Sequence, residues 1–203
     1  RYIIDHFVGY INSELPLSVW EKEIKQKAKE ILLLLTKEKD SALHLAKQKV
    51  NEMVTERLSE LKLPEYNIFY PVKIEIQQLE NCTRLNVQSI DTPFFLYTLS
   101  TALSLHKISI EHVQINTIND QIEDKIDFVD IYGKKISQPQ ILDQIKLSVL
   151  LTKQFTYFLS RSPDPYTALS RFEYLVEDIL KLSQQGKWLE LLSSPQIMQD
   201  LAR

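Results

Sequence analysis

The chain has 203 residues, of which 44% are hydrophobic and 25% are charged, and its formal net charge is −3. This length and composition suit one large folded domain or two small ones and exclude wholesale disorder. The charge balance gives no electrostatic reason to bind nucleic acid or an anionic membrane surface. The three glycines are isolated from one another, which excludes a glycine-rich phosphate loop.

A single cysteine, Cys82, excludes an intrachain disulfide and any multi-cysteine metal site, and favours a reducing compartment. The longest apolar run, Ile31–Leu35, is far shorter than the ~20 residues of a membrane span. We therefore expect a cytoplasmic protein without a membrane segment. Because the sequence opens at Arg1 without an initiator methionine or signal-peptide pattern, we interpret it as a piece of a longer protein.

Residues 1–64 are predicted to be helical, with apolar residues at helical spacing throughout. Ser18 and Glu21 form a capping-box pattern at the start of one helix, and Asp40 or Ser41 caps the next. The first apolar stretch comprises Ile3, Ile4, Phe7, Val8 and Ile11, and the stripe of the second helix comprises Ile24, Ala28, Ile31, Leu32 and Leu35. Stripes of this kind predict a helical bundle or arm that packs on its own apolar face.

Apolar and polar residues alternate from residue 69 onward, which is typical of strands. A strand over 69–79 is expected to pair with one over 83–90 as a β-hairpin, with the turn near Cys82. Asp91-Thr92-Pro93 then opens a helix. The inner face of that helix is predicted to comprise Phe95, Leu96, Leu99, Ala102 and Leu103.

A strand over 108–115 follows, and a change of phase near His112 predicts a β-bulge. The next strand is expected over 126–131 after a turn at Asn119-Asp120. Ser137 is predicted to cap a helix with Pro139 in its first turn.

The predicted elements follow one another in the order hairpin, helix, strand, strand, helix. This order predicts an α+β fold: a ferredoxin-like antiparallel sheet with two helices on one face. The usual final strand is missing, and the strand at 69–79 is a candidate to fill its place. We expect a helical region at 1–66, the ferredoxin-like domain at 67–152 and a second helical region at 153–203. In the last region Asp164 is the predicted N-cap of a helix that begins at Pro165. That helix is expected to end near Gly186, before a segment around Trp188 and a last helix from Pro195.

The residue types that carry catalysis show no chemical grouping in this sequence. The histidines (His6, His44, His106 and His112) lack the spacing of a metal site and are interpreted as surface or half-buried side chains. The aspartates at a spacing of three (Asp124, Asp127 and Asp130) would be divided between the two faces of a strand, and we interpret them as solvated. No catalytic residue, metal ligand or cofactor site is predicted.

Residues 72–136 are similar to the ACT domain, a small ligand-sensing module, and most similar to the ACT repeats of bacterial nitrogen-signalling nucleotidyltransferases. The resemblance depends on the strand Thr83–Val87, the stretch Asp91–Tyr97, the strand Val113–Thr117, and the spacing of Asp124, Asp130 and Gly133. The family has Asp-Arg-Pro-Gly-Leu-Leu-Tyr where this chain has Asp-Thr-Pro-Phe-Phe-Leu-Tyr. The tail from Phe155 also resembles helical linkers of glutamine-synthetase adenylyltransferases.

The resemblance implies an effector loop that binds a small amino acid such as glutamine. The candidate effector-binding residues are Asp91, Thr92, Pro93, Phe94, Phe95, Leu96, Asn116 and Thr117. Phe94 stands where the family has a glycine that lets the ligand approach the backbone. We therefore expect its ring to occupy the space that a ligand would need.

The resemblance also implies the function. The chain would be the regulatory part, ligand-sensing or domain-coupling, of a protein-PII uridylyltransferase or glutamine-synthetase adenylyltransferase. Mg²⁺ would belong only to the catalytic domain of that parent enzyme, and the partners would be its other domains or a second ACT domain. The alternative is a degenerate ACT module that serves as a protein–protein or dimerisation surface without an effector. An ACT region of an amino-acid biosynthetic enzyme also stays open.

Overall fold

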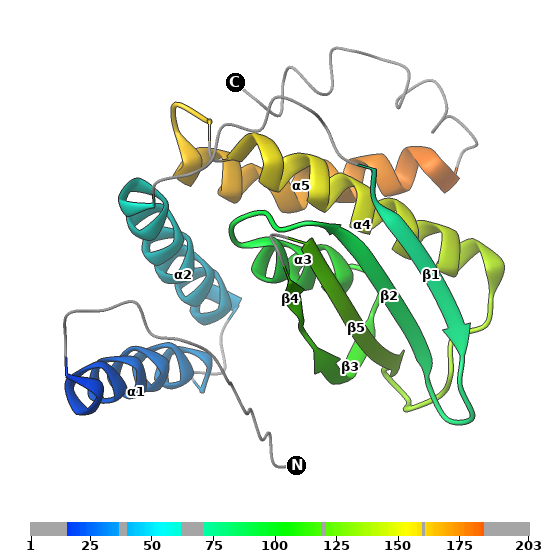
Figure 1. Ribbon diagram of the computed structural model, residues 1–203, viewed down its shortest axis with the longest axis horizontal. Coiled ribbons are helices and arrows are strands. Elements are labelled where there is room, and N and C mark those ends of the chain that lie inside the picture. Colours follow the sequence, from blue (N-terminus) through cyan, green and yellow to red (C-terminus); the bar gives the residue numbers. More distant parts are fainter. Residues whose placement is uncertain (1–15, 37–39, 62–70, 119–120, 160, 185–203) are drawn as a thin grey trace. The chain divides into compact units, whose positions relative to one another are not determined.

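The computed structural model describes residues 16–36, 40–61, 71–118, 121–159 and 161–184. The chain divides into two units, Arg1–Val50 and Asn51–Arg203, so the boundary falls within a helix (Figure 1). The predicted helix before Pro16, the turn at Asn119-Asp120, and the predicted elements from Gly186 onward lie outside the described residues.

The first unit contains helix α1 (Leu17–Leu35) and the beginning of helix α2 (Asp40–Glu60), which confirms the helical prediction for these residues. The prediction of Ser18 as the N-cap of α1 was wrong. Pro16 is the N-cap, and its carbonyl oxygen accepts hydrogen bonds from the amides of Val19 and Trp20. Glu30 of α1 forms an ion pair with Lys49 of α2. No residue of α1 is buried among the described residues, and Ile31 of its apolar stripe is half-buried.

The second unit contains one antiparallel sheet. Its strands are β1 (Lys73–Gln78), β2 (Thr83–Ile90), β3 (Ile108–Gln114), β4 (Thr117–Ile118) and β5 (Gln121–Asp130). Four of them lie in the order β1-β2-β5-β3, and the short β4 pairs with β5 (Figure 1). The predicted hairpin is confirmed, because β1 and β2 pair without interruption from Lys73 opposite Gln88 to Gln78 opposite Thr83.

Two details of the strand prediction have different outcomes. The bulge near His112 is confirmed, since the register of β3 against β5 shifts between Ile110 and His112. The strand predicted over 126–131 in fact begins at Gln121. Its first half was missed because Asp124, a polar residue, occupies a position that faces the helices and so breaks the apolar alternation.

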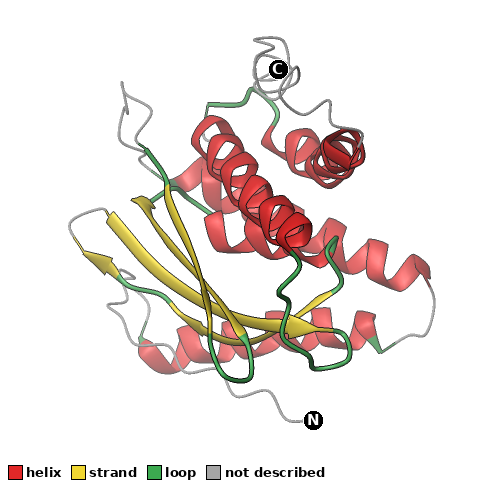
Figure 2. Ribbon diagram, turned by 90° about the vertical axis from the view of Figure 1, so that its right-hand side faces the viewer, coloured by secondary structure: helices red, strands yellow, loops and turns green. Residues whose placement is uncertain are grey.

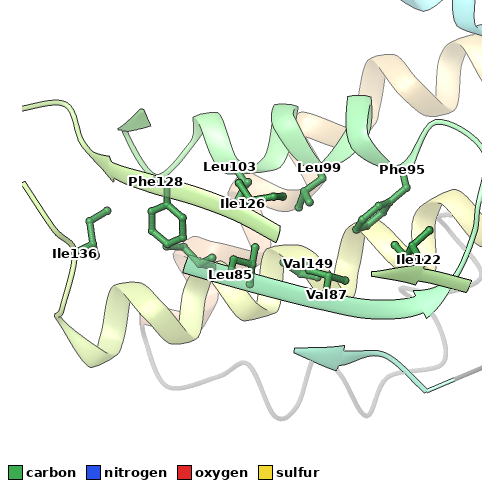
Figure 3. Packing of buried hydrophobic residues seen from close by; sticks show 11 residues of the cluster. Leu85, Val87, Phe95, Leu99, Leu103, Ile122, Ile126, Phe128, Ile136 and Val149 are labelled. Atoms are coloured by element: carbon green, nitrogen blue, oxygen red, sulfur yellow. The ribbon is translucent and has the colours of Figure 1, made fainter. Parts of the chain in front are cut away.

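Helices α3 (Phe95–Ser104) and α4 (Pro139–Leu159) contribute to the core on one face of the sheet (Figure 2). The core contains Leu85 and Val87 from β2, Ile122, Ile126 and Phe128 from β5, Phe95, Leu99 and Leu103 from α3, and Ile136, Ile145 and Val149 from α4 and the segment before it (Figure 3). Burial of such side chains is the main stabilising contribution to a fold of this size. The prediction that Leu96 is a core residue was wrong, because its side chain is 36% exposed. Thr98, which we did not predict, is buried on the inner face of α3.

Helix α4 begins at Pro139, directly after Gln138, so Ser137 lies one position too early to be its cap. The helix continues without a break to Leu159, across the boundary that we expected at residue 152. Helix α5 (Pro165–Gln184) follows, and the Asp164 carboxylate accepts the amide hydrogen of Thr167 at 3.0 Å, which confirms the predicted N-cap. Hydrogen bonds from the Thr167 hydroxyl and from this amide hold the pKa of Asp164 below its usual value.

Phe94, the N-cap of α3, has a left-handed backbone with φ +60° and ψ +19°. This conformation is unfavourable for a residue with a Cβ by about 1 kcal/mol, and glycine adopts it freely. Phe94 therefore adopts a backbone conformation that glycine would adopt without strain.

We predict that Phe94→Gly is more stable than Phe94→Ala by about 1 kcal/mol, because both remove the ring and only alanine keeps the backbone strain. The matched control is Ser100, an exposed residue inside α3. There Ser100→Gly should be less stable than Ser100→Ala by about 1 kcal/mol. Urea unfolding of the four variants measures both differences, and the same sign at both positions would contradict the prediction.

Candidate functional site

The residues predicted from the sequence as effector ligands are divided by the structure into an inner and an outer group. Thr92 and Phe95 are buried, whereas Pro93, Phe94 and Asn116 are half-buried and Asp91, Leu96 and Thr117 are exposed. Phe94 is half-buried, and the expectation that its ring occupies the space a ligand would need stays a prediction. The neighbouring Phe95, only 4% exposed, is the aromatic residue that enters the core.

Lys153 of α4 is the residue that meets this loop inside the protein. It is 3% exposed, and its Nζ atom donates hydrogen bonds to the Ile90 carbonyl oxygen at 2.7 Å and to Thr92 Oγ1 at 3.0 Å. The same ammonium group lies 4.0 Å from the centre of the Phe95 ring. Three partners from one short segment thus surround the buried cation.

A chain of hydroxyl groups extends this contact along α4. Thr92 Oγ1 and Thr156 Oγ1 are 2.8 Å apart, and Thr156 Oγ1 also lies 3.0 Å from the Thr152 carbonyl oxygen. Because Thr92 accepts a hydrogen bond from Lys153, it can donate its own proton to Thr156, which in turn donates to Thr152. Each hydroxyl group is then satisfied, as buried polar groups require.

Asp124 of β5 supplies the opposite charge. It is 3% exposed, and its Oδ1 atom has no hydrogen-bond partner among the described residues. Burial raises the pKa of Asp124 to about 6, while attraction to Lys153 and a backbone hydrogen bond from Asn116 act in the opposite direction. Burial also lowers the pKa of Lys153 to about 8, opposed by the charges of Asp91 and Asp124.

We call Thr92, Phe95, Asp124, Lys153 and Thr156 the buried polar cluster. It contains one cation, one incompletely satisfied carboxylate and two hydroxyl groups between the sheet and α4. These groups can hold the loop after β2 against α4, and they match the carboxylate and ammonium groups of an amino acid in charge. Among the residues that the structure describes, no group of three or more histidine, cysteine, aspartate or glutamate side chains could hold a metal ion.

Sequence reasoning missed Lys153, Thr156 and the burial of Asp124, although two signals were available. Lys153 is the one charged residue between Ser148 and Leu159, in the middle of an apolar stretch. Asp124 has the same strand parity as Ile122 and Ile126, so it faces the core once the strand is taken to begin at Gln121.

The three aspartates that we interpreted as solvated lie in three different environments. Asp124 is buried in the cluster, so that interpretation was wrong for it. It was also wrong for Asp127, which is 8% exposed and accepts two hydrogen bonds from Arg84, Nε to Oδ1 at 2.6 Å and Nη2 to Oδ2 at 2.8 Å. The Arg84 guanidinium holds the pKa of Asp127 below its usual value. Asp130 Oδ1 accepts amide hydrogen bonds from the turn at Tyr132 and Lys134.

Two other groups could suggest chemistry. His106 Nε2 lies 2.8 Å from Ser148 Oγ, and burial lowers the pKa of His106 to about 4. Ser148 is fully buried, so this contact belongs to the packing of the turn after α3 against α4. A polar hollow of about 310 Å³ lies over β1, β2 and β5, lined by Lys73, Glu75, Gln77, Arg84, Asn86, Val87, Gln88, Glu123, Asp124 and Lys125.

Comparison with known proteins found no match to a family model, to a curated protein or to a solved structure. The ACT resemblance and the nitrogen-signalling function therefore stay predictions. None of the helices within the described ranges combines the length with the apolar character that a membrane-spanning segment needs.

The buried carboxylate predicts how stability depends on pH. Asp124 keeps its proton to higher pH in the folded chain than in the unfolded chain, so its contribution to stability is present below about pH 4 and is lost as pH rises through about 6. Asparagine does not titrate, so the free energy of unfolding of Asp124→Asn should rise by about 1–3 kcal/mol relative to that of the wild type as the pH is raised from about 4 to above 6, whatever constant difference the loss of the charge beside Lys153 adds.

Unfolding in urea across this pH range measures the effect. Asp143→Asn on α4, whose side chain is 73% exposed, is the control and should follow the wild type. A difference between Asp124→Asn and wild type that does not change with pH would show that the carboxylate is not buried as described.

Proposed function

We propose that this chain is a non-catalytic regulatory module that couples the loop after β2 to the helices α4 and α5. The observation that carries the proposal is the contact of Lys153 with Ile90 and Thr92, because it joins the loop to the middle of α4. The resemblance to ACT repeats implies that this loop is the one at which an effector or partner acts. The parent enzyme would be a nucleotidyltransferase that controls glutamine synthetase or PII signalling.

The sheet supports the ferredoxin-like part of the proposal. Strand β1 lies beside β2, at the edge where a final strand would otherwise stand, and α3 and α4 contribute to the core on one face. In this reading, the extra strand β1, which precedes β2 in the sequence, occupies the edge position of the missing final strand. This arrangement agrees with the expectation that residues 69–79 replace the missing strand.

Helix α4 carries the second half of the coupling. Phe155, two residues after Lys153, stacks on Phe172 of α5 with ring centres 4.3 Å apart. Both aromatic residues are at most 2% exposed. A change in the loop that displaces Lys153 would therefore act on a helix whose next turn is packed against α5, through a continuous set of contacts.

Hydrogen exchange tests this coupling. Lys153→Met should increase hydrogen exchange in the loop and also in α5, because α4 loses its anchor to the loop. Methionine keeps the length and the apolar stem of the lysine side chain, so only the ammonium group is removed. Lys146→Met is the matched control: it makes the same substitution on the same helix, at a side chain that is 44% exposed. Faster exchange confined to residues 90–96 in the Lys153 variant would contradict the coupling.

A second candidate function is effector binding by the same cluster, and the unpaired Oδ1 of Asp124 favours it. An amino acid such as glutamine would present its ammonium group to Asp124 and its carboxylate to Lys153. The groups are enclosed, so binding would require the loop to open.

Isothermal titration with glutamine and the other common amino acids separates the two candidates. For a sensor we expect saturable binding by the wild type that falls at least about tenfold in both Asp124→Asn and Lys153→Met, because each removes one charged contact. Exposed Asp143→Asn should bind as the wild type does. Binding by none of the proteins would leave domain coupling without an effector as the function.

A further inference from the structure

The outer edge of β1 has the features of a pairing surface. Among the described residues, β1 pairs only with β2, so the backbone groups along its other edge have no strand partner. The opposite edge strand, β3, is interrupted by the bulge between Ile110 and His112. Bulges of this kind are one way in which sheets protect their edges from pairing with another strand. Strand β1 has no such protection, because its register is unbroken over its whole length.

The hydrogen-bond phase shows which backbone groups of β1 point outward. The Leu79 amide donates to the Cys82 carbonyl oxygen at 3.0 Å, so this pair faces across the hairpin. Such pairs alternate along an antiparallel ladder. Residues 73, 75 and 77 therefore direct their backbone groups toward β2, and residues 72, 74 and 76 direct theirs to the open edge.

The side chains of β1 are self-complementary in one antiparallel register. If Ile74 lies opposite Ile74 of a second copy, then Lys73 faces Glu75 of that copy and Glu75 faces its Lys73. The side chains of Lys73 and Glu75 are 64% and 52% exposed and already form an ion pair along the strand at 3.0 Å. In the register centred on Glu75, two carboxylates would stand directly opposite each other, which is unfavourable.

The apolar side chains of β1 favour the same register. Ile74 and Ile76 of β1, and Val72 directly before it, are half-buried and pack against the core. In the register centred on Ile74 the two Ile74 side chains meet, and each Val72 lies opposite an Ile76. The outward backbone groups of residues 72, 74 and 76 are the ones that this register pairs.

We propose that two copies of this chain associate through β1, antiparallel and centred on Ile74, so that the two sheets become one. A contact of about five residues on each side is small, so we place the association in the weak, concentration-dependent class. The inference does not depend on the proposed function, because no residue of the buried polar cluster lies on β1.

Charge reversal tests the register. Sedimentation velocity from micromolar to millimolar protein should show a monomer–dimer equilibrium for the wild type. Lys73→Glu should weaken dimerisation about tenfold, because it places like charges opposite each other twice. The double variant Lys73→Glu/Glu75→Lys should restore the affinity. Lys125→Glu makes the same charge change on β5, two strands away from this edge, and should leave it unchanged.

Proline substitution tests the backbone pairing. Ile74→Pro removes an amide that faces the open edge and spares those bonded to β2, so the chain should stay folded and fail to dimerise. Circular dichroism confirms that the variant is folded. A wild type that is monomeric at all concentrations would overturn the proposal. A dimer that Lys73→Glu and folded Ile74→Pro leave unchanged would also overturn it, by placing the contact on another surface.

Discussion

An ammonium group buried between a sheet and a helix is stable only where protein groups replace its water, and this constraint joins the parts of the second unit. Lys153 finds a carbonyl oxygen, a hydroxyl group and an aromatic face, all within residues 90–95. The position of α4 and the path of the loop therefore depend on each other. The left-handed backbone of Phe94 lies within this same segment, where the chain passes from β2 into α3.

Asp124 gives the cluster a second property. A carboxylate with one unpaired oxygen and a cation with a depressed pKa share the same interior, so each partly compensates the other. Removal of one charge leaves the other buried without compensation, which is costly. Such a site responds strongly to anything that changes its charge or its hydration. Because α4 continues from the cluster to its contact with α5, that response is not confined to the loop.

The two faces of the sheet have different chemistry because of simple strand parity. Residues of one parity in β2 and β5 form the core with α3 and α4, and residues of the other parity form a polar surface that includes the Arg84–Asp127 ion pair. Strand β1 extends both surfaces to the edge. Its half-buried isoleucines continue the apolar side, and its lysine and glutamate continue the polar side.

Local patterns in the sequence determined the hairpin at Cys82, the bulge near His112 and the Asp164 cap, because each depends on neighbouring residues and short-range hydrogen bonds. The cluster could not be obtained in this way, since Thr92, Asp124 and Lys153 meet only when the sheet and α4 pack. Whether an aspartate on a strand is solvated depends on what covers that strand. Helical periodicity placed Phe95 in the core correctly, whereas the left-handed backbone of Phe94 is visible only in the structure. Spacing along the chain gives the elements, and the burial of charge between them is a property of the tertiary structure alone.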